Sequence, residues 1–270
     1  MKPLRILSFG AGVQSTTLLE MALRGDIEAV DHVIFADTGW EPNPVIENMV
    51  EYGERCAEAG VPFHVVANGN IRSDALDLGH RFASMPLHVA ASPDKPQTIA
   101  RRQCTNEYKL QPLLKKQREL AGLGKGQRSK DHLVTSLIGI SLDEIQRMRD
   151  GAFPWIKNEY PLVDLRMTRQ SCKSYMDKHH LPEPPRSACI GCPYHSDHEW
   201  RQIKADPIQW ADAIAFDASI RVGEIGKRLY GGRAYLHPKR IPLAIVDLST
   251  EEDRGQGTLF DNECQGMCGL

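Results

Sequence analysis

A glycine-rich turn near the start of the chain has residue types suited to an anion. An apolar run at 4–9 ends in the segment "GAGVQS" at 10–15, and a helical repeat follows it. A loop between a strand and a helix directs backbone N–H groups and the positive helix end at one point, which suits phosphate. Gly10 and Gly12 allow the backbone to approach a ligand closely, and Ser15 adds a hydroxyl donor.

The sequence of this turn leaves several interpretations open. A Walker loop is excluded, because no Lys-Ser or Lys-Thr pair follows the glycines. A dinucleotide fingerprint is a near match, with Ser15 where a third glycine or alanine should stand and Asp37 placed to bind a ribose. A pyrophosphate loop of the Ser-Gly-Gly-x-Asp-Ser type, here degenerate, is the next interpretation. A simple tight turn is the last, and the loop alone does not separate these three.

Cys189 and Cys192 form a CxxC pair, the second group with the types and spacing for chemistry. Gly191 permits the tight turn that directs two thiolates at one ion. The pair alone is compatible with zinc, an iron–sulfur cluster or a redox disulfide. The chain has seven cysteines, and this odd number argues against a disulfide framework. For a zinc site, the candidate further ligands are His195, His198 and His237.

The composition is that of an ordinary globular protein. The chain has 270 residues, of which 41% are hydrophobic and 25% charged, and its formal net charge is −2. These values fit one large or two small domains and give no overall basic surface for nucleic acid or membranes. No apolar segment reaches membrane-spanning length, and the first residues enter a strand pattern without a signal-peptide core. We therefore expect a cytoplasmic protein with no membrane partner.

The elements that must position these residues alternate between strands and helices. Apolar runs indicate strands, and amphipathic segments between them indicate helices. This order predicts an α/β fold, a parallel sheet with crossover helices. The expected strands are 4–9, 31–37, 61–68 and 132–140, and the expected helices are 15–23, 44–60 and 108–120.

The remaining segments have weaker patterns. Residues 69–100 lack periodicity and predict a long loop or lid. The chain after Pro161 is predicted to be mostly helical, with a late edge strand at 241–248. We accordingly expect a nucleotide-binding α/β domain at 1–160 and a mostly helical, cysteine-containing region at 161–270 packed on it.

Four further segments occur in a fixed order after the glycine turn. They are "VIFADTGWEP" at 33–42, "RRQCTNEYKLQPL" at 101–113, "IGISLDEIQRMRD" at 138–150 and "SACIGCPYHS" at 187–196. Together with the turn, they make a sequence that resembles the phosphoadenosine phosphosulfate (PAPS) reductase family. That family lies within the PP-loop superfamily of adenine nucleotide α-hydrolase-like proteins. The combination is far more specific than any one segment.

The resemblance implies a Rossmann-like parallel sheet flanked by helices, with a site for an adenine nucleotide at the strand ends. The residues implied to line the phosphates are Ser8, Gly10, Gly12, Gln14 and Ser15. Those implied to lie beside the nucleotide are Asp37, Thr38 and Gly39, and a further closing loop contains Gly139, Glu144 and Arg147. The implied cations for a substrate phosphate or sulfate are Arg101, Arg102 and Lys109.

These roles agree with the chemistry of the side chains. Arginine matches phosphate with two parallel hydrogen bonds, and lysine supplies a point charge. An aspartate beside a triphosphate, here Asp37, commonly holds Mg²⁺. Two simpler interpretations remain: Arg101 and Arg102 begin a solvated helix, and Glu144 and Arg147 form an exposed helical ion pair.

The resemblance also implies a [4Fe–4S] cluster, with zinc as the alternative metal. The family places a cysteine at Cys104, which joins Cys189 and Cys192 on the cluster. Members with a cluster have two adjacent cysteines at that point, but here Gln103 precedes Cys104. The fourth ligand must come from elsewhere, or one iron is open; we favour Cys268 over the alternatives, which are Cys264 and Cys172. Cys56 is predicted to be a small core residue.

Three functions follow as hypotheses. In the first, ATP is cleaved to AMP and pyrophosphate, and a substrate oxygen is adenylated. Sulfur from a donor protein then displaces AMP, with the iron–sulfur cluster carrying or passing sulfide. The basic segment 124–131 makes tRNA or DNA one candidate substrate. In the second, a sulfonucleotide reductase uses Cys264 as its nucleophile and a thioredoxin-type electron donor, because Glu263–Cys264 resembles that family's Glu-Cys-Gly ending. The third is a non-catalytic nucleotide-binding module with structural zinc, and none of the three predicts an oligomeric state.

Overall fold

The computed structural model describes residues 2–80 and 85–250. The described chain divides into two compact units. The first contains residues 2–68 and 106–187, and the second contains 69–80, 85–105 and 188–250. This division does not coincide with the predicted boundary after residue 160, because the chain enters the second unit twice.

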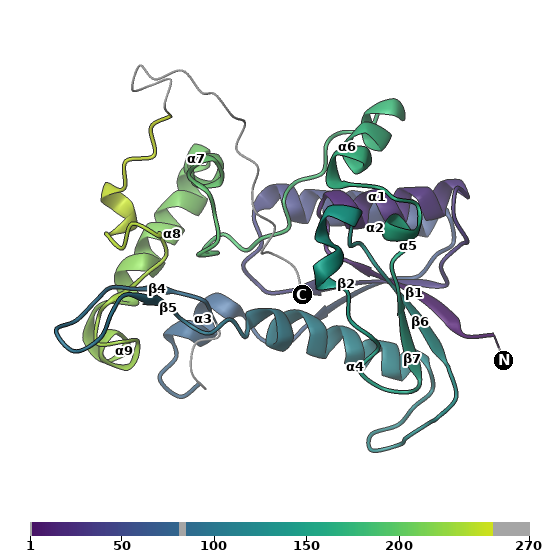
Figure 1. Ribbon diagram of the computed structural model, residues 1–270, viewed down its shortest axis with the longest axis horizontal. Helices are drawn as coiled ribbons and strands as arrows, with labels where there is room; N and C mark the ends of the chain where they lie inside the picture. The colour runs from purple at the N-terminus through teal and green to yellow at the C-terminus, as the bar shows by residue number, and fades with distance from the viewer. Residues whose placement is uncertain (1, 81–84, 251–270) are drawn as a thin grey trace. The chain divides into compact units, whose positions relative to one another are not determined.

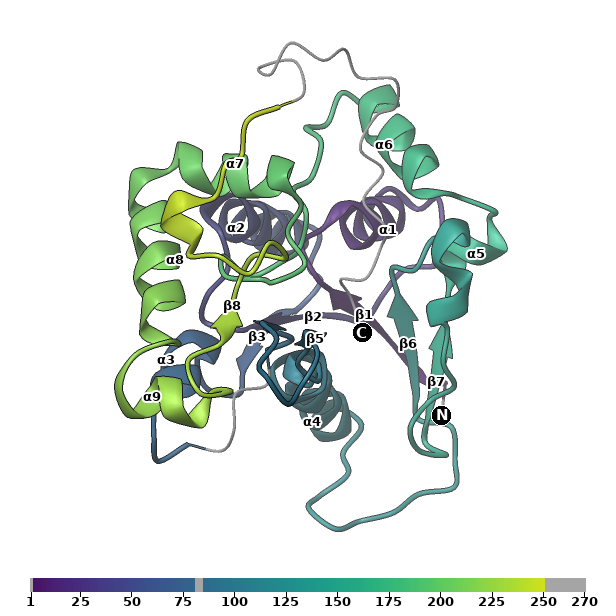
Figure 2. The ribbon, with the colours of Figure 1, turned by 60° about the vertical axis from the view of Figure 1, so that its left-hand side comes forward.

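A five-stranded parallel sheet forms the centre of the first unit, as the sequence predicts (Figure 2). The strand order is β3-β2-β1-β6-β7, and every neighbouring pair is parallel. The strands are β1 (Leu4–Phe9), β2 (His32–Asp37), β3 (Phe63–Ala67), β6 (Val134–Ile138) and β7 (Ile156–Glu159). Strand β7 was not predicted, because its short sequence "IKNE" is mostly polar and lies at a sheet edge.

Helices cover both faces of this sheet, because successive strand side chains point to opposite faces (Figure 1). Leu7 and Phe35 pack with apolar residues of the helices on one face. Ile6 and Ile34 pack on the other face with Leu113. The first face carries α1 (Val13–Arg24), α2 (Asn43–Glu58), α5 (Pro161–Asp164) and α6 (Arg169–Lys178), and the second carries α4 (Gln111–Leu120).

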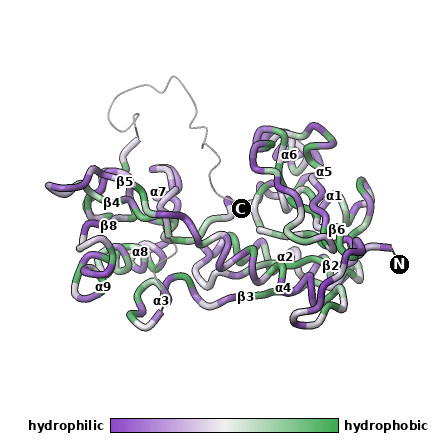
Figure 3. The backbone as a smooth tube through the Cα atoms, turned by 60° about the horizontal axis from the view of Figure 1, so that its bottom comes forward, coloured by the Kyte–Doolittle hydropathy of each residue, from purple (hydrophilic) through white to green (hydrophobic). Residues whose placement is uncertain are grey.

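Most helices of the first unit lie close to their predicted bounds. The helix expected at 108–120 is instead two elements, a π-helix η1 (Thr105–Leu110) that runs directly into α4. Figure 3 shows hydrophilic and hydrophobic stretches alternating along α6, whose buried residues are Cys172 and Met176. None of the described helices is long and apolar enough to cross a membrane.

The second unit contains short elements around a small antiparallel sheet of order β5-β4-β8. Residues 69–100, predicted as a loop, contain three of these elements: α3 (Ile71–Leu76), β4 (His88–Val89) and β5 (Thr98–Ile99). The others are β8 (Ala234–Tyr235), α7 (Asp197–Ala205), α8 (Pro207–Ser219), α9 (Gly223–Arg228) and a 3₁₀ turn, η3 (Leu243–Ile245). The edge strand predicted at 241–248 is therefore wrong, and Pro242, which lacks an N–H donor, directly precedes the turn.

Candidate functional site

The order of the strands locates the candidate site of the first unit. The chain builds the sheet from β1 to β2 and β3 in one direction, and then crosses to β6 on the other side of β1. In open parallel sheets, ligands bind outside the carboxyl ends of the strands at this switch point. The loops that follow β1 and β6 meet there. Of the predicted phosphate ligands, Gly10 and Gly12 lie in the first loop, Gln14 and Ser15 in the first turn of α1, and Ser8 near the end of β1, where its Oγ lies 3.4 Å from Ser136 Oγ.

The loop after β1 folds around the hydroxyl of Ser15. Ser15 Oγ accepts hydrogen bonds from the N–H groups of Gly10 (3.2 Å) and Gly12 (3.3 Å), and donates one to the carbonyl of Gly12 (3.2 Å). Three predicted phosphate ligands are thus brought together at the first turn of α1. The arrangement directs the positive end of a twelve-residue helix at the loop.

The backbone of this loop is strained at Ala11. Its φ is 54°, in the left-handed region that residues with a Cβ rarely adopt. The amide of Asn48, in α2, holds the strained turn by donating to the carbonyl of Ala11 (3.0 Å) and to Thr16 Oγ1 (2.9 Å). Such strain persists only where surrounding contacts enforce it, and it occurs most often at functional sites. Asn48 was missed by the sequence analysis.

Two glycines of the predicted site allow the backbone to pack closely. A Cβ added at Gly139, after β6, would lie 2.7 Å from the backbone nitrogen of Ser15. A Cβ at Gly12 would lie 3.0 Å from Cβ of Ser187, whereas one at Gly10 would make only ordinary contacts. Gly139 therefore has a steric reason to be glycine, which is separate from any contact with a ligand.

Gln14 connects the helix α1 to two other segments. Its Nε2 donates to Glu144 Oε2 (3.3 Å) and to Ser141 Oγ (3.4 Å), and its Oε1 accepts from Arg169 Nη1 (3.2 Å). The arginine donor assigns which end of the amide is oxygen. The side chain of Gln14 therefore fastens the loop after β6 and the start of α6, and Arg169 is a further residue that the sequence analysis missed.

Glu144 and Arg147 lie at this junction in a 3₁₀ helix, η2 (Leu142–Arg147). They form an ion pair of 2.7 Å, with side chains 12% and 17% exposed. Burial raises the pKa of Glu144 above its usual value, and the Arg147 charge opposes that rise. The simpler interpretation, in which Glu144 and Arg147 form an ion pair, is confirmed. The pair is mostly buried, however, whereas that interpretation placed it on an exposed helix surface.

The loop after β2 contains the other residues implied to lie beside the nucleotide. Asp37 Oδ1 accepts from the N–H of Gly39 (2.7 Å), whose φ is 75°. Thr38 donates to Glu41 Oε1 (3.0 Å), and Lys109 Nζ lies 3.6 Å from the same oxygen. The loop thus adds a buried carboxylate, Glu41, which the sequence analysis missed although it stands within the motif at 33–42.

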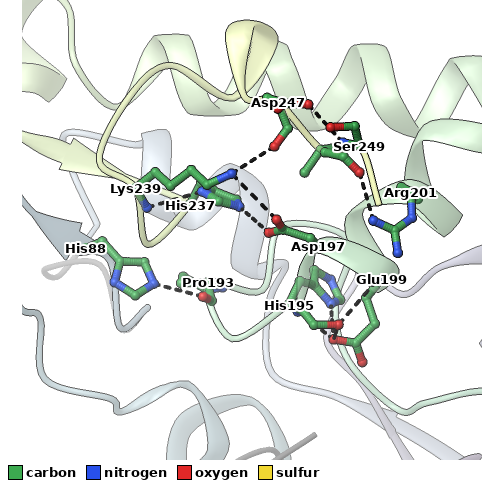
Figure 4. A network of polar contacts seen from close by, with 12 residues as sticks. His88, Pro193, His195, Asp197, Glu199, Arg201, His237, Lys239, Asp247 and Ser249 are labelled. Carbon is green, nitrogen blue, oxygen red and sulfur yellow. Dashed lines mark hydrogen bonds and ion pairs between the residues drawn. The ribbon is translucent and has the colours of Figure 1, made fainter. Parts of the chain in front are cut away.

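The CxxC pair lies in the second unit, in a tight turn. The N–H of Cys192 donates to the carbonyl of Cys189 (3.0 Å), and His195 Nε2 lies 2.9 Å from the same carbonyl oxygen. Figure 4 shows His88 Nε2 directed at the carbonyl of Pro193, at 2.9 Å. Because β4 supplies His88, the turn is held by a strand distant in the sequence.

Arg102 and Cys104 belong to the same unit as the CxxC pair. Arg102 donates to Thr105 Oγ1 (2.7 Å), and its guanidinium lies over the ring of Tyr194, 5.6 Å from the centroid. The neighbouring Arg101 is exposed and precedes the helix, which agrees with the simpler interpretation of a solvated helix start. Arg102 is half-buried and makes specific contacts, so that interpretation does not extend to it.

His237 is not arranged to ligate zinc. The ring is fully buried, and its Nε2 lies 2.9 Å from Asp197 Oδ1 (Figure 4). Its Nδ1 accepts from the N–H of Lys239 (3.2 Å), so both ring nitrogens are occupied. Burial lowers the pKa of this ring.

A metal ion or cluster needs several donor side chains grouped around one point. Within residues 2–80 and 85–250, no three His, Cys, Asp or Glu side chains are grouped to hold a metal ion. Cys104, Cys189 and Cys192 therefore do not assemble such a site by themselves, and Cys264 and Cys268 lie outside the described residues. The [4Fe–4S] cluster and zinc stay predictions.

Two other cysteines lie in the core of the first unit. Cys172, an alternative cluster ligand, is fully buried among apolar residues of α1 and α2, and burial raises its pKa to about 12. Such a thiol resists the deprotonation that ligation requires, so this alternative is not supported. Cys56 is a buried core residue, as predicted.

The basic segment 124–131 lies away from the candidate site of the first unit. It connects the end of α4 to the start of β6, which places it at the amino edge of the parallel sheet. The loops at the switch point lie at the carboxyl edge. A nucleic acid bound by this segment would therefore contact the opposite end of the sheet from the glycine loop after β1.

Solved structures include matches to this chain. No family model and no curated protein match the chain. Among solved structures, it is similar to phosphoadenylyl-sulfate (PAPS) reductase from Candida auris, in a phosphate complex, with 15% identity and a TM-score of 0.43. The match covers 68% of this chain and 76% of that chain.

Proposed function

We propose that this chain is a PP-loop enzyme that binds an adenine nucleotide at the switch point and uses ATP in sulfur transfer. One observation carries the proposal: the strained turn around Ala11, at a helix N-terminus and beside Gly139, lies where parallel sheets bind phosphorylated ligands. The N–H groups of Gly10 and Gly12 are the donors for the phosphate chain. Asp37, at the end of β2, is the carboxylate expected to hold Mg²⁺ with a triphosphate.

The proposed reaction has two steps. A substrate oxygen attacks the α-phosphorus of ATP, and pyrophosphate leaves with the electron pair of the broken P–O bond. The oxygen, now joined to AMP, has become a good leaving group. Hydrosulfide supplied by a sulfur-donor protein then attacks the activated carbon or phosphorus and forms the carbon–sulfur or phosphorus–sulfur bond. AMP leaves with the electron pair of the broken carbon–oxygen or phosphorus–oxygen bond. The loop holds the leaving pyrophosphate, and Lys109 supplies positive charge to the reacting phosphate.

Gln14 favours a second candidate, sulfonucleotide reduction. It stands where the PP-loop pattern has an aspartate, and its amide is engaged by Glu144 and Arg169. The turn itself therefore has no carboxylate for a magnesium-bound triphosphate. In this candidate, the Cys264 thiolate attacks the sulfonyl sulfur, the nucleotide phosphate leaves, and a thioredoxin-type dithiol reduces the S-sulfocysteine to release sulfite. Cys264 lies outside the described residues.

Calorimetry with the intact chain tests the proposal. The ligands are ATP with magnesium, adenylyl sulfate, its 3′-phosphate, and adenosine as the control without phosphate. We expect the phosphorylated ligands to bind and adenosine, which offers no phosphate to the loop, to bind much more weakly. Equal binding of adenosine and ATP, or no nucleotide binding, would contradict the proposal.

Product analysis separates the candidates. Pyrophosphate released from ATP supports sulfur transfer, and sulfite released from a sulfonucleotide, lost in Cys264→Ser, supports reduction. Binding without either product supports the non-catalytic module. Visible absorption and metal analysis of an anaerobically purified sample test the predicted cluster against zinc.

A further inference from the structure

Glu41, after β2, is a buried carboxylate to which the proposed reaction gives no role. Its side chain is fully buried, at 0% exposed. Removing a carboxylate from water is costly unless opposite charge and hydrogen bonds compensate for the lost hydration. Such a group at the carboxyl edge of the sheet, next to the phosphate-binding loop, therefore needs a structural partner.

The compensation comes mainly from Lys109. Thr38 donates one hydrogen bond to Glu41 Oε1 (3.0 Å), and the Lys109 ammonium lies 3.6 Å from that oxygen. Glu41 Oε2 is buried and has no hydrogen-bond partner within residues 2–80 and 85–250. The positive charge of Lys109 is therefore what makes burial of this carboxylate tolerable.

The same contact gives the Lys109 ammonium an anionic partner on its buried side. Lysine has a long flexible stem, so the position of its ammonium depends on the groups that contact it. Lys109 belongs to the π-helix η1, a type of turn often found at functional sites, and its side chain remains 26% exposed. Asn68, just beyond β3, donates to the carbonyl of Glu107 (2.8 Å), which places η1 at the carboxyl edge of the sheet.

We propose that Glu41 is a positioning residue for Lys109, holding its ammonium where the phosphate or sulfate of the substrate binds. This inference rests on the proposed function, in which Lys109 contacts that anion. Glu41 does not touch the ligand. It orients the lysine from the buried side, and the exposed part of the lysine acts on the substrate.

The direction in which one substitution changes nucleotide affinity distinguishes a positioning role from a simple electrostatic one. Glu41→Gln keeps an acceptor for Thr38 and removes the negative charge. If Glu41 only adds negative charge near an anionic ligand, its removal strengthens nucleotide binding. If Glu41 positions Lys109, its removal takes away the anionic contact that orients the ammonium and weakens nucleotide binding, by about tenfold.

The experiment measures the dissociation constant by calorimetry for ATP with magnesium, adenylyl sulfate and its 3′-phosphate. The variants are Glu41→Gln, Lys109→Met and the double variant, each with a thermal unfolding curve. We expect Glu41→Gln to weaken binding in the natural background and to have no further effect in Lys109→Met. Glu28→Gln is the matched control, because Glu28 pairs with Lys2 at the amino edge of the sheet; its affinity should equal that of the unmodified chain.

The outcomes separate the two proposals. If the unmodified chain binds none of the three nucleotides, the proposed function fails, and the positioning role with it. If it binds them and Glu41→Gln binds equally or more tightly, only the positioning role is overturned. The same holds if Glu41→Gln weakens binding equally with and without Lys109. If Glu41→Gln does not fold, Glu41→Asp replaces it: the charge stays but retracts, and undiminished affinity overturns the proposal.

Discussion

The loop after β1 and the turn at the CxxC pair are both tight, glycine-containing turns, but they are built differently. The first lies between regular elements, and its shape comes from backbone geometry: a left-handed residue, a helix end and a close glycine contact. The second is held by side chains from distant segments, such as His88 of β4. The first turn is shaped largely by its own contiguous backbone, with added support from Asn48 and Gly139. The second depends on long-range contacts that a sequence does not reveal.

The largest expected effect tests the long-range contacts of the second unit. Asp217, 1% exposed, accepts from the N–H groups of Leu236 (3.0 Å) and Leu243 (2.8 Å) and pairs with Arg221 (2.8 Å). Asp217→Ala leaves these groups without their acceptor, so we expect a loss of about 3–5 kcal/mol in the free energy of unfolding. Urea unfolding measures it, and hydrogen exchange should increase in peptides of the second unit.

Glu224→Ala is the control for this prediction. Glu224 pairs with Lys227 on the surface of the same unit, with side chains 65% and 75% exposed. Such a pair contributes less than about 0.5 kcal/mol. Similar losses for Glu224→Ala and Asp217→Ala would show that buried long-range contacts do not dominate this unit.

A glycine substitution tests the backbone geometry of the first unit. Gly139→Ala would place a Cβ 2.7 Å from the backbone nitrogen of Ser15, which cannot move without disturbing the start of α1. We expect the free energy of unfolding to fall by about 1–3 kcal/mol, with faster hydrogen exchange in the first unit. Gly10→Ala, where the added carbon makes ordinary contacts, should be much better tolerated. Equal stability of the two variants would contradict the steric role of Gly139.

Removing the side-chain amide of Asn48, which contacts the same loop, should lower the free energy of unfolding somewhat less. Asn48→Ala removes two buried hydrogen bonds, to Ala11 and Thr16, and should cost about 1–2 kcal/mol of unfolding free energy while weakening nucleotide binding. Asn158→Ala is the matched control, because Asn158 donates to the carbonyl of Arg149 at an exposed position. If calorimetry gives the same nucleotide affinity for both variants, Asn48 does not hold the loop for binding.

The smallest expected effect is a pH dependence of the second unit. Burial lowers the pKa of His88 and His237 in the folded chain below the usual value of 6.5. The unfolded chain therefore takes up protons first as the pH falls, so their contribution to stability is complete above pH 6.5 and is lost below it. Urea unfolding between neutral and mildly acidic pH should show this loss, and the double variant His88→Gln, His237→Gln should reduce it. An unchanged pH dependence in that variant would refute the assignment.

The sequence predicted the elements whose patterns are local and periodic. Strand β1 and the helices α1 and α2 lie close to their expected positions, because their apolar residues repeat at the period of the element. Strand β7 and the elements within 69–100 were missed, because short or polar segments acquire their structure from pairing with distant strands. The edge strand at 241–248 was predicted from apolar content alone, and this segment instead contains the 3₁₀ turn η3.

The same division applies to the residues of the site. Gly10, Gly12 and Ser15 are recognisable because the turn that joins them is short and contiguous. Glu41 and Arg169 were missed because their significance lies in partners far away in sequence, Lys109 and Gln14. Carboxylates within motifs and arginines at helix starts are common on protein surfaces. Only their burial and contacts distinguish Glu41 and Arg169 from such surface residues.

The hydroxyl of Ser15 already occupies the two amides that a phosphate oxygen would use. A nucleotide at this turn must therefore exchange one acceptor for another, and it gains little from hydrogen-bond number alone. Its affinity must come from formal charge meeting the helix end and the nearby cations. Neutral analogues of the same shape should accordingly be rejected, and tight binding should decline steeply as the ionic strength rises.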